Sequence, residues 1–263
     1  LEDVLAEVSA LARRGVLEVE FLGQTVNAYR DEAGRTLADL LRRTAEIDGV
    51  RRVRFTTSHP AQMTPALIEA MSDARPQLCP YLHLPVQSGS STVLERMRRG
   101  YDRQGYLSRI AALRRRMPDL RFGTDIIVGF PGETDAEFEE TLTLLDDVPF
   151  DTVYSFAYSE RPGTRAIDLG DTVPLALKIE RLRRLQERQK QIQEHRHREF
   201  VGRTVEVLVE GPSKRDPSRW TGRTADNRIV HFPGDSAPGR LSRVRVTEST
   251  AYCLHGLPEA ANA

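Results

Sequence analysis

The stretch Thr124–Glu133, with the sequence TDIIVGFPGE, constrains the fold of this chain more than any other feature. Its apolar half is typical of a buried β-strand, and the Gly-Pro-Gly turn leads at once into a helical pattern over Thr134–Asp146. A strand that passes through a tight loop into a helix directs backbone N–H groups to the carboxyl edge of a sheet. Small ligands of α/β proteins bind at that edge. The sequence therefore predicts an α/β domain with a ligand site beside this loop.

Helix-period and strand-like segments alternate over residues 1–160, which predicts a parallel sheet with helical crossovers. The expected strands are 16–22, 50–57, 81–86, 120–128 and 152–158, with helices over 4–15, 37–47, 64–71, 91–98, 106–117 and 133–146. Such strands form an open sheet or curl into an α/β partial barrel. Because the chain begins with a helix, we expect that the first strand is missing and that the chain is a fragment of something longer.

The hydrophobic period changes twice after residue 173. Residues 174–200 are typical of one long helix, and a period of two follows in segments 204–210, 219–224, 228–232 and 241–248. Short strands separated by Pro, Gly and Asn indicate a small, all-β antiparallel barrel. We therefore expect an incomplete α/β domain over 1–177, a connecting helix over 178–199, a small barrel over 200–257 and a tail over 258–263.

The charges are unevenly distributed along the chain, although the net charge is zero. Residues 1–177 carry 21 Lys and Arg against 27 Asp and Glu, whereas residues 178–257 carry 17 against 10. A basic C-terminal region favours contact with a polyanion, and a solvated Arg-rich helix is the plainer alternative. The absence of a run of about 18 apolar residues predicts no membrane span. Two separated cysteines, Cys79 and Cys253, argue against a disulfide framework and favour a cytoplasmic protein.

Polar residues at the expected strand ends exceed what turns and helix caps require. Gln24, Asn27, Gln87 and Asp125 are the clearest cases. In a barrel of parallel strands such side chains gather at the C-terminal rim and form a site for a polar ligand. Four arginines also cluster around Gly100, and they suit either a carboxylate or phosphate ligand or a solvated helix end. They are Arg96, Arg98, Arg99 and Arg103.

Basic and aromatic residues are interleaved on the expected small barrel. The basic residues are Lys214, Arg215, Arg219, Arg223, Arg228, Arg243 and Arg245, and the aromatic ones are Trp220, His231 and Phe232. Proteins that bind single-stranded RNA use charge to follow phosphates and aromatic rings to stack on bases. We therefore expect RNA binding here, with a generic domain whose tryptophan belongs to the core as the alternative. No zinc spacing, Walker motif or dinucleotide fingerprint is present, so we expect no metal ligands.

Several segments together resemble the radical S-adenosylmethionine domain of methylthiotransferases. They are FLGQTVNAYR (21–30), FTTSHP (55–60), LHLPVQSGSSTVLERMRRGY (82–101), TDIIVGFPGETDAEFEETL (124–142) and YSERPGTRA (158–166). The segment VEGPSKRDPSRWTGRTADNRIVHF (209–232) resembles the TRAM domain that ends those enzymes. The resemblance spans nearly the whole chain. It implies a radical SAM partial barrel followed by a TRAM barrel that binds RNA.

Within the family, the chain most resembles the MiaB-type tRNA methylthiotransferases. These transferases add a methylthio group to carbon 2 of isopentenyl-adenosine next to the anticodon, by radical SAM chemistry. Relatives that act on threonylcarbamoyl-adenosine in tRNA or on a ribosomal protein are alternatives. There are two further alternatives. One is an RNA-binding pseudoenzyme without a cluster, and the other is a barrel enzyme that binds a phosphorylated metabolite.

The resemblance also implies cofactors and partners. The cofactors are S-adenosylmethionine and two 4Fe–4S clusters in the full-length enzyme. The family's CxxxCxxC motif is absent, and Cys79 and Cys253 match no cluster position. We therefore expect that this chain ligates no cluster, supplies no catalytic residue and is inactive as given. The implied partners are a tRNA anticodon stem-loop, a flavodoxin-like electron donor and a sulfur source, with a monomeric protein.

The resemblance assigns site residues to both domains. For the cofactor, it implies Gly23 and Gln24 near the methionine amino group, and Arg98 or Arg99 at the carboxylate. It implies Gln87 and Ser88 at the ribose. The adenine side comprises Asp125, Ile127 and the segment from Gly129 to Glu133, with Phe156 and Tyr158 nearby. For the RNA, it implies Thr57, Ser58 and His59 at the rim, and Lys214, Arg215, Arg219, Trp220, Arg223 and Arg228 on the small barrel.

Overall fold

The structure is a computed structural model that describes residues 1–56 and 58–259. Its first part is a curved sheet of parallel strands: β1 (Glu18–Phe21), β2 (Arg52–Phe55), β3 (Tyr81–His83), β4 (Arg121–Val128) and β5 (Thr152–Ala157). β1 pairs with β2, and β3, β4 and β5 pair in that order. Val53 of β2 bridges in parallel to Leu78, which precedes β3, so the two sheets continue into each other. The expected partial barrel is confirmed.

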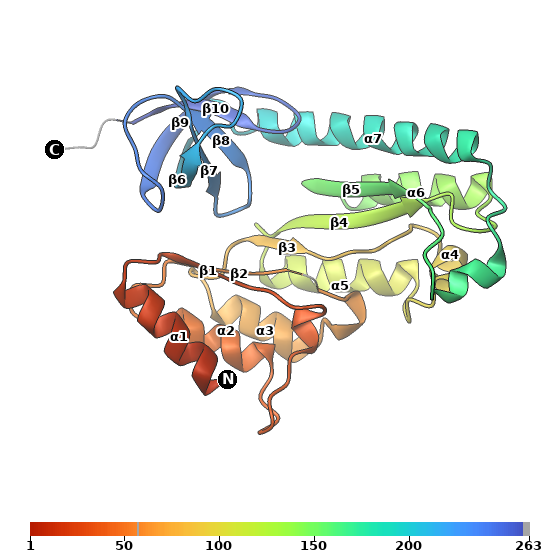
Figure 1. Cartoon of the computed structure of the whole chain (residues 1–263), viewed down its shortest axis with the longest axis horizontal. Helices are drawn as coiled ribbons and strands as arrows, with labels where there is room; N and C mark the ends of the chain where they lie inside the picture. Colours follow the sequence, from red (N-terminus) through yellow and green to blue (C-terminus); the bar gives the residue numbers. More distant parts are fainter. Residues whose placement is uncertain (57, 260–263) are drawn as a thin grey trace.

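The helices of this part lie on the outer face of the curved sheet (Figure 1). They are α1 (Glu2–Arg13), α2 (Leu37–Ala45), α3 (Pro65–Asp73), α4 (Ser91–Arg96), α5 (Arg103–Arg116) and α6 (Asp135–Asp147), with short 3₁₀ turns at Val26–Ala28, Pro60–Gln62 and Arg165–Leu169. Thr64 begins α3 by accepting a hydrogen bond from the Leu67 N–H at 3.2 Å. Thr134 begins α6 with a capping box formed with Glu137. The helix starts therefore follow from local capping.

The alternation of side chains along β4 separates the core from the concave face of the sheet. Phe122, Ile126 and Val128 are buried among the helices. Asp125 and Ile127, between them in the sequence, face the other way and remain partly exposed. The concave face of the partial barrel is therefore open enough to hold a ligand.

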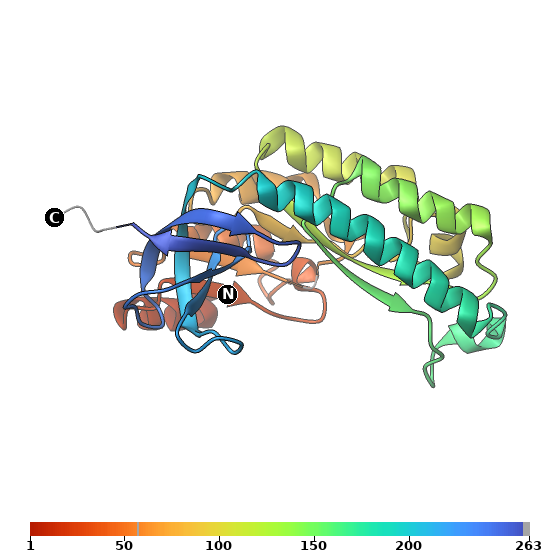
Figure 2. The same ribbon diagram turned by 90° about the horizontal axis from the view of Figure 1, so that it is seen from above.

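Helix α7 (Leu175–Arg198) runs along β5 and leads into a second, small barrel (Figures 1 and 2). The barrel strands are β6 (Thr204–Pro212), β7 (Trp220–Thr224), β8 (Ile229–Phe232), β9 (Leu241–Ser249) and β10 (Leu254–Pro258). They close in the order β10-β8-β7-β6-β9 around valines of β6, β8 and β9. Among the residues that the structure describes, no helix has the length and apolar character needed to cross a membrane.

Strand β10 corrects the expected barrel, which had four antiparallel strands. It pairs in parallel with β8 and antiparallel with β9, and so closes the barrel. Its sequence, LHGLP, is short and ends in proline, so its pattern is weaker than that of the other strands. Pro258 belongs to β10 rather than to the expected tail over 258–263, of which residues 260–263 lie outside the described part.

The small barrel packs against the starts of the parallel strands. Arg52 donates to the Arg223 carbonyl at 3.0 Å, and Arg54 donates to the Thr224 carbonyl at 2.8 Å. Both arginine side chains are nearly buried. Because these bonds join β2 to β7, the barrel occupies the amino-terminal end of the sheet. The carboxyl ends of the strands lie at the opposite end (Figure 1).

Candidate functional site

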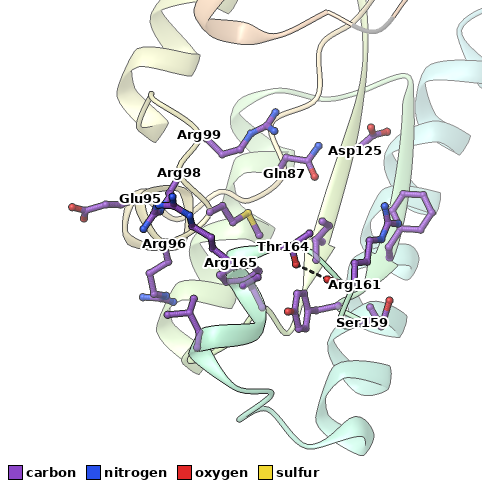
Figure 3. A pocket seen from close by; sticks show the side chains of 18 residues that line it. Gln87, Glu95, Arg96, Arg98, Arg99, Asp125, Ser159, Arg161, Thr164 and Arg165 are labelled. Atoms are coloured by element: carbon purple, nitrogen blue, oxygen red, sulfur yellow. Dashed lines mark hydrogen bonds between the residues drawn. The ribbon is translucent and has the colours of Figure 1, made fainter. Parts of the chain in front are cut away.

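A cavity of about 1010 Å³ opens at the carboxyl ends of β4 and β5 (Figure 3). Gln87 and Asp125 contribute polar groups to its wall, while Ile127 and Phe156 contribute apolar surface. The segment that follows β5 forms another part of the wall, up to Leu169. Polar groups beside a flat apolar wall suit a ligand that combines an aromatic ring with charged groups.

Asp125 and Phe156 reach the cavity because their strands present them on the concave face. The carboxylate of Asp125 lies 3.1 Å from Nε2 of His83, whose ring packs edge-on against Tyr154. Phe156 is 54% exposed and lines the cavity, so it offers apolar surface to a ligand. Tyr158 also lines the cavity, and its ring packs against Phe130.

Gln87 lines the cavity, whereas its neighbour Ser88 does not. The backbone of Gln87 has a positive φ of 76° and joins β4 through hydrogen bonds to the Asp125 carbonyl and from the Ile127 N–H. Ser88 is fully buried, with its hydroxyl 3.3 Å from that of Thr141 in α6. The expected contact between Ser88 and a ribose therefore disagrees with the structure, because α6 covers the Ser88 side chain.

Glu133 likewise acts inside the protein rather than on the cavity wall. Its carboxylate accepts hydrogen bonds from the Gly129 N–H at 2.8 Å and from Arg181 of α7 at 2.9 Å. Burial raises the pKa of Glu133, although both bonds act in the opposite direction. Gly129 has a φ of +68°, and a Cβ there would lie 2.4 Å from Lys178 Cγ. These two residues shape the loop after β4. The expected contact of Glu133 with the ligand is corrected, because its carboxylate binds Gly129 and Arg181 instead.

Two arginines of the predicted cluster are free to bind an anion in the cavity. Arg96 is engaged by both carboxylate oxygens of Glu137, at 2.9 and 3.0 Å. Arg98 and Arg99 also line the cavity, and neither has a carboxylate partner among the described residues. Within the described part of the chain, Arg99 donates to the Tyr101 hydroxyl, at 3.2 Å. The expectation that Arg98 or Arg99 binds a carboxylate is compatible with this arrangement.

Of the remaining predicted cofactor and rim residues, the four that the structure describes, Gly23, Gln24, Ser58 and His59, lie outside the cavity wall. Gly23 and Gln24 follow β1, at the same edge of the sheet. Ser58 is nearly buried, and His59 is held through its backbone by the Asn27 side chain, at 2.8 and 2.9 Å. Burial lowers the pKa of His59, and nearby arginines act in the same direction. Thr57 lies outside the described residues.

Most of the predicted RNA-contacting residues lie at the surface of the small barrel. Lys214 and Arg215 are exposed. Arg219 lies 3.5 Å from Asp216, and Arg223 lies 2.8 Å from Glu210. The indole N–H of Trp220 donates to the Gly234 carbonyl at 2.9 Å, and the ring packs on the barrel core. Trp220 therefore packs on the barrel core, and because it is only partly buried, its stacking on RNA stays a prediction.

Arg228 corrects the prediction for the RNA surface. Its side chain is 2% exposed and donates to Asp151 at 2.7 Å and to Asp226 at 3.0 Å. Its guanidinium also lies 4.3 Å from the centre of the Phe200 ring. An arginine enclosed in this way cannot reach an RNA phosphate, so Arg228 joins the two domains instead.

The two cysteines do not fit an iron–sulfur cluster. Cys79 is buried, and burial raises its pKa to about 11, which disfavours the thiolate. Cys253 lies on the small barrel, with its sulfur 3.4 Å from Nε2 of His255. Cluster ligation requires three or four converging thiolates. Within residues 1–56 and 58–259, no group of three or more His, Cys, Asp and Glu side chains is arranged to hold a metal ion.

A partial parallel barrel with a cavity at its carboxyl edge defines an α/β ligand-binding protein, here joined to a second domain that is a small closed β-barrel. The chain belongs to the radical SAM superfamily, whose family description matches residues 1–145, and the TRAM domain matches residues 198–257. It shares the fold of the radical SAM enzyme coproporphyrinogen III oxidase from Escherichia coli, at a TM-score of 0.57 and 14% identity. That similarity covers 85% of this chain and 59% of the oxidase.

Much closer similarity in sequence links the chain to tRNA-modifying enzymes. It is 48% identical over 258 residues to the tRNA-2-methylthio-N(6)-dimethylallyladenosine synthase of Moorella thermoacetica. It is 50% identical over 260 residues to the synthase of the same name from Halorhodospira halophila. Each match covers 97% of this chain, and 58% and 55% of the respective relative. The chain therefore spans little more than half the length of these relatives.

The sequence did not assign several residues that line the cavity. Met97, Arg161 and Arg165 are the main ones, whereas Phe130 belongs to the predicted adenine side. Arg161 and Arg165 lie in the segment YSERPGTRA, where two arginines flank a Pro-Gly turn directly after an expected strand. That combination of charge and turn at a strand end is the signal that could have identified them.

Proposed function

We propose that the whole protein is a tRNA methylthiotransferase that modifies carbon 2 of isopentenyl-adenosine beside the anticodon. This chain would supply its cofactor pocket and its RNA-binding barrel. The observation that carries the proposal is the pairing of an arginine-bearing cavity at the carboxyl edge with a docked TRAM barrel. The similarity to synthases of this name over 97% of the chain supports the substrate.

The residues of the cavity suit S-adenosylmethionine. Arg98 or Arg99 would hold the methionine carboxylate, because neither has a carboxylate partner among the described residues. Gln87 and Asp125 offer hydrogen bonds to polar groups, while Ile127 and Phe156 offer a face to the adenine. When bound, the cofactor supplies the radical chemistry of this superfamily. The contribution of the chain is to bind and orient the cofactor and to exclude water from it.

The TRAM barrel would hold the anticodon stem-loop. Lys214, Arg215 and Arg219 would contact phosphates, and the exposed part of Trp220 would stack against a base. An adenosine inside an anticodon loop must be turned out of the loop to enter a cavity in the protein. The proposal therefore requires RNA contacts at both ends of the partial barrel.

The other parts of the reaction depend on groups that this chain does not provide. We propose two 4Fe–4S clusters with ligands elsewhere in the full-length protein, since Cys79 and Cys253 lie apart in separate domains. A flavodoxin-like electron donor, a sulfur source, a monomeric state and a cytoplasmic location complete the proposal.

The deciding experiment uses the full-length protein, reconstituted anaerobically with iron, sulfide and dithionite. It is incubated with S-adenosylmethionine and an anticodon stem-loop that carries isopentenyl-adenosine, and the RNA is analysed by mass spectrometry. We expect a methylthio adduct on that stem-loop and none on a matched stem-loop with unmodified adenosine. Modification of threonylcarbamoyl-adenosine or of a ribosomal protein instead would transfer the assignment to those substrates. RNA binding without cleavage of S-adenosylmethionine would indicate a pseudoenzyme.

A further inference from the structure

We infer that Arg161 and Arg165 bind phosphates of the RNA strand that flanks the target base, at the mouth of the cofactor cavity. The inference rests on the proposed function and adds a second RNA contact, remote from the TRAM barrel. Both side chains are exposed, and both line the cavity. Figure 3 shows Arg161 across the cavity from Arg98 and Arg99.

The first argument is the charge of the cavity wall. The wall contains Arg96, Arg98, Arg99, Arg161 and Arg165 against Glu95 and Asp125. Glu137 engages Arg96, and His83 lies against Asp125. The other four arginines have no carboxylate within 4.0 Å among the residues that the structure describes. Such an excess of positive charge around one cavity attracts anions.

The second argument is that the cofactor accounts for only part of this charge. S-adenosylmethionine has a single carboxylate, which one guanidinium can bind through two parallel hydrogen bonds. It also carries an ammonium and a sulfonium group, and each of these is repelled by further arginines. The remaining guanidinium groups therefore match an anionic substrate. An RNA strand supplies a phosphate at every nucleotide, and arginine is well suited to phosphate binding.

The third argument is the geometry of the segment after β5. Thr164 folds the chain back on itself, because its N–H and its hydroxyl both donate to the Arg161 carbonyl, at 3.2 and 2.8 Å. Gly163 supplies the positive φ of 82° that this turn needs. Arg161 and Arg165 therefore lie at the two ends of one tight turn. Two cations held in this way can contact neighbouring phosphates of one strand.

The test compares three double variants of the reconstituted full-length protein. Arg161→Gln/Arg165→Gln removes both charges, and Arg161→Lys/Arg165→Lys keeps them. The matched control, Arg13→Gln/Arg14→Gln, removes two exposed charges at the end of α1, outside the cavity wall. The dissociation constant of the isopentenyl-adenosine stem-loop is measured as a function of salt concentration. The affinity for S-adenosylmethionine is measured separately by equilibrium dialysis.

We expect the Gln variant to bind the stem-loop roughly tenfold more weakly at moderate salt. The slope of log K against log salt should become shallower by about 1.4, because two phosphate contacts to a single strand are lost. The Lys variant and the control should retain the wild-type slope, and the affinity for S-adenosylmethionine should remain unchanged.

Two outcomes would overturn the inference while leaving the proposed function intact. One is a wild-type salt slope in the Gln variant. The other is a loss of S-adenosylmethionine affinity with RNA binding unchanged, which would assign the two arginines to the cofactor. Failure of the wild-type protein to bind the stem-loop would instead refute the proposed function, and this inference with it.

Discussion

Arg228 of the small barrel and Asp151 at the start of β5 form a hydrogen-bonded ion pair, 2.7 Å long, between two nearly buried side chains. Asp151 also accepts two hydrogen bonds from Arg196 of α7, both at 2.9 Å. One carboxylate thus joins the sheet, the connecting helix and the barrel. Burying these charges is costly, so the arrangement depends on every partner being present.

Asp151→Asn should destabilise the contact between the two domains. The change leaves Arg228 and Arg196 without their shared carboxylate, while Asp226 still pairs with Arg228. We expect the free energy of unfolding to fall by about 3 kcal/mol, the lower end for breaking a buried pair. Urea denaturation of the full-length protein measures this loss. Asp146→Asn, which breaks an exposed pair with Arg188, should cost less than about 1 kcal/mol. Equal effects of the two changes would contradict the prediction.

Glu137 should make stability depend on pH in the acidic range. Hydrogen bonds from Arg96, and then from Thr92 and the Thr134 backbone, lower its pKa from 4.5 to about 2, against the effect of burial. A lowered pKa in the folded state means that its contribution is present above pH 4.5 and is lost as the pH falls towards 2.

The variant Glu137→Gln should therefore show a weaker dependence of unfolding free energy on pH in that range. Denaturation curves recorded at several values between about pH 2 and 6 would measure it. Glu139→Gln, on the same helix and paired with Arg184 at the surface, should behave like the wild type. A pH profile of Glu137→Gln that matches the wild type would refute the role of this carboxylate.

Arg98→Gln should weaken the binding of S-adenosylmethionine by roughly tenfold to a hundredfold, the usual value of a charge-assisted hydrogen bond. The reason is the loss of the guanidinium that we propose binds the methionine carboxylate. A decarboxylated analogue provides the control, since it should bind the wild type and the variant equally. Equilibrium dialysis with both ligands measures the difference, and the same comparison with Arg99→Gln decides between the two arginines. If both variants still prefer S-adenosylmethionine over the decarboxylated analogue as strongly as the wild type does, neither arginine is the carboxylate site.

Arg219→Gln should weaken binding of the anticodon stem-loop and make its salt slope shallower by about 0.7, the value for one phosphate. Arg219 is 39% exposed, and its contact with Asp216 is long at 3.5 Å, so it can turn towards RNA. The control is Arg14→Gln at the end of α1, an exposed arginine outside the small barrel. Titration at a series of salt concentrations gives both slopes. If the two variants have the same slope, the face around Trp220 is not the RNA surface.

Much of the fold could be predicted from local patterns, because burial in this protein follows strand and helix periods closely. Phe122, Ile126 and Val128 alternate with residues of the concave face, and Thr64 and Thr134 begin their helices by capping. Strand β10 escaped prediction because it has few apolar residues and depends on pairing with both β8 and β9.

An excess of polar residues over structural need predicted part of the candidate site. Gln87 and Asp125 line the cavity, whereas Asn27, which met the same condition, is buried and binds the His59 backbone. The prediction wrongly placed Arg228 at the surface. Its partner Asp151 lies 77 positions earlier in the chain, and no local pattern in the sequence links the two residues. Ser88 and Glu133 were misassigned for the same reason, since Thr141 and Arg181 cover them from other helices.

Helix α7 sets the size of an RNA that can make both of the proposed RNA contacts at once. Its 24 residues correspond to a length of about 36 Å, and it spans from the cavity end of the sheet to the small barrel (Figure 1). Asp151 holds the C-terminal part of the helix through Arg196, so the distance between the two ends of the helix is fixed. An RNA that touches both ends must itself bridge that span. An oligonucleotide of a few residues would contact only one of the two ends, and would bind without the added affinity of two simultaneous contacts.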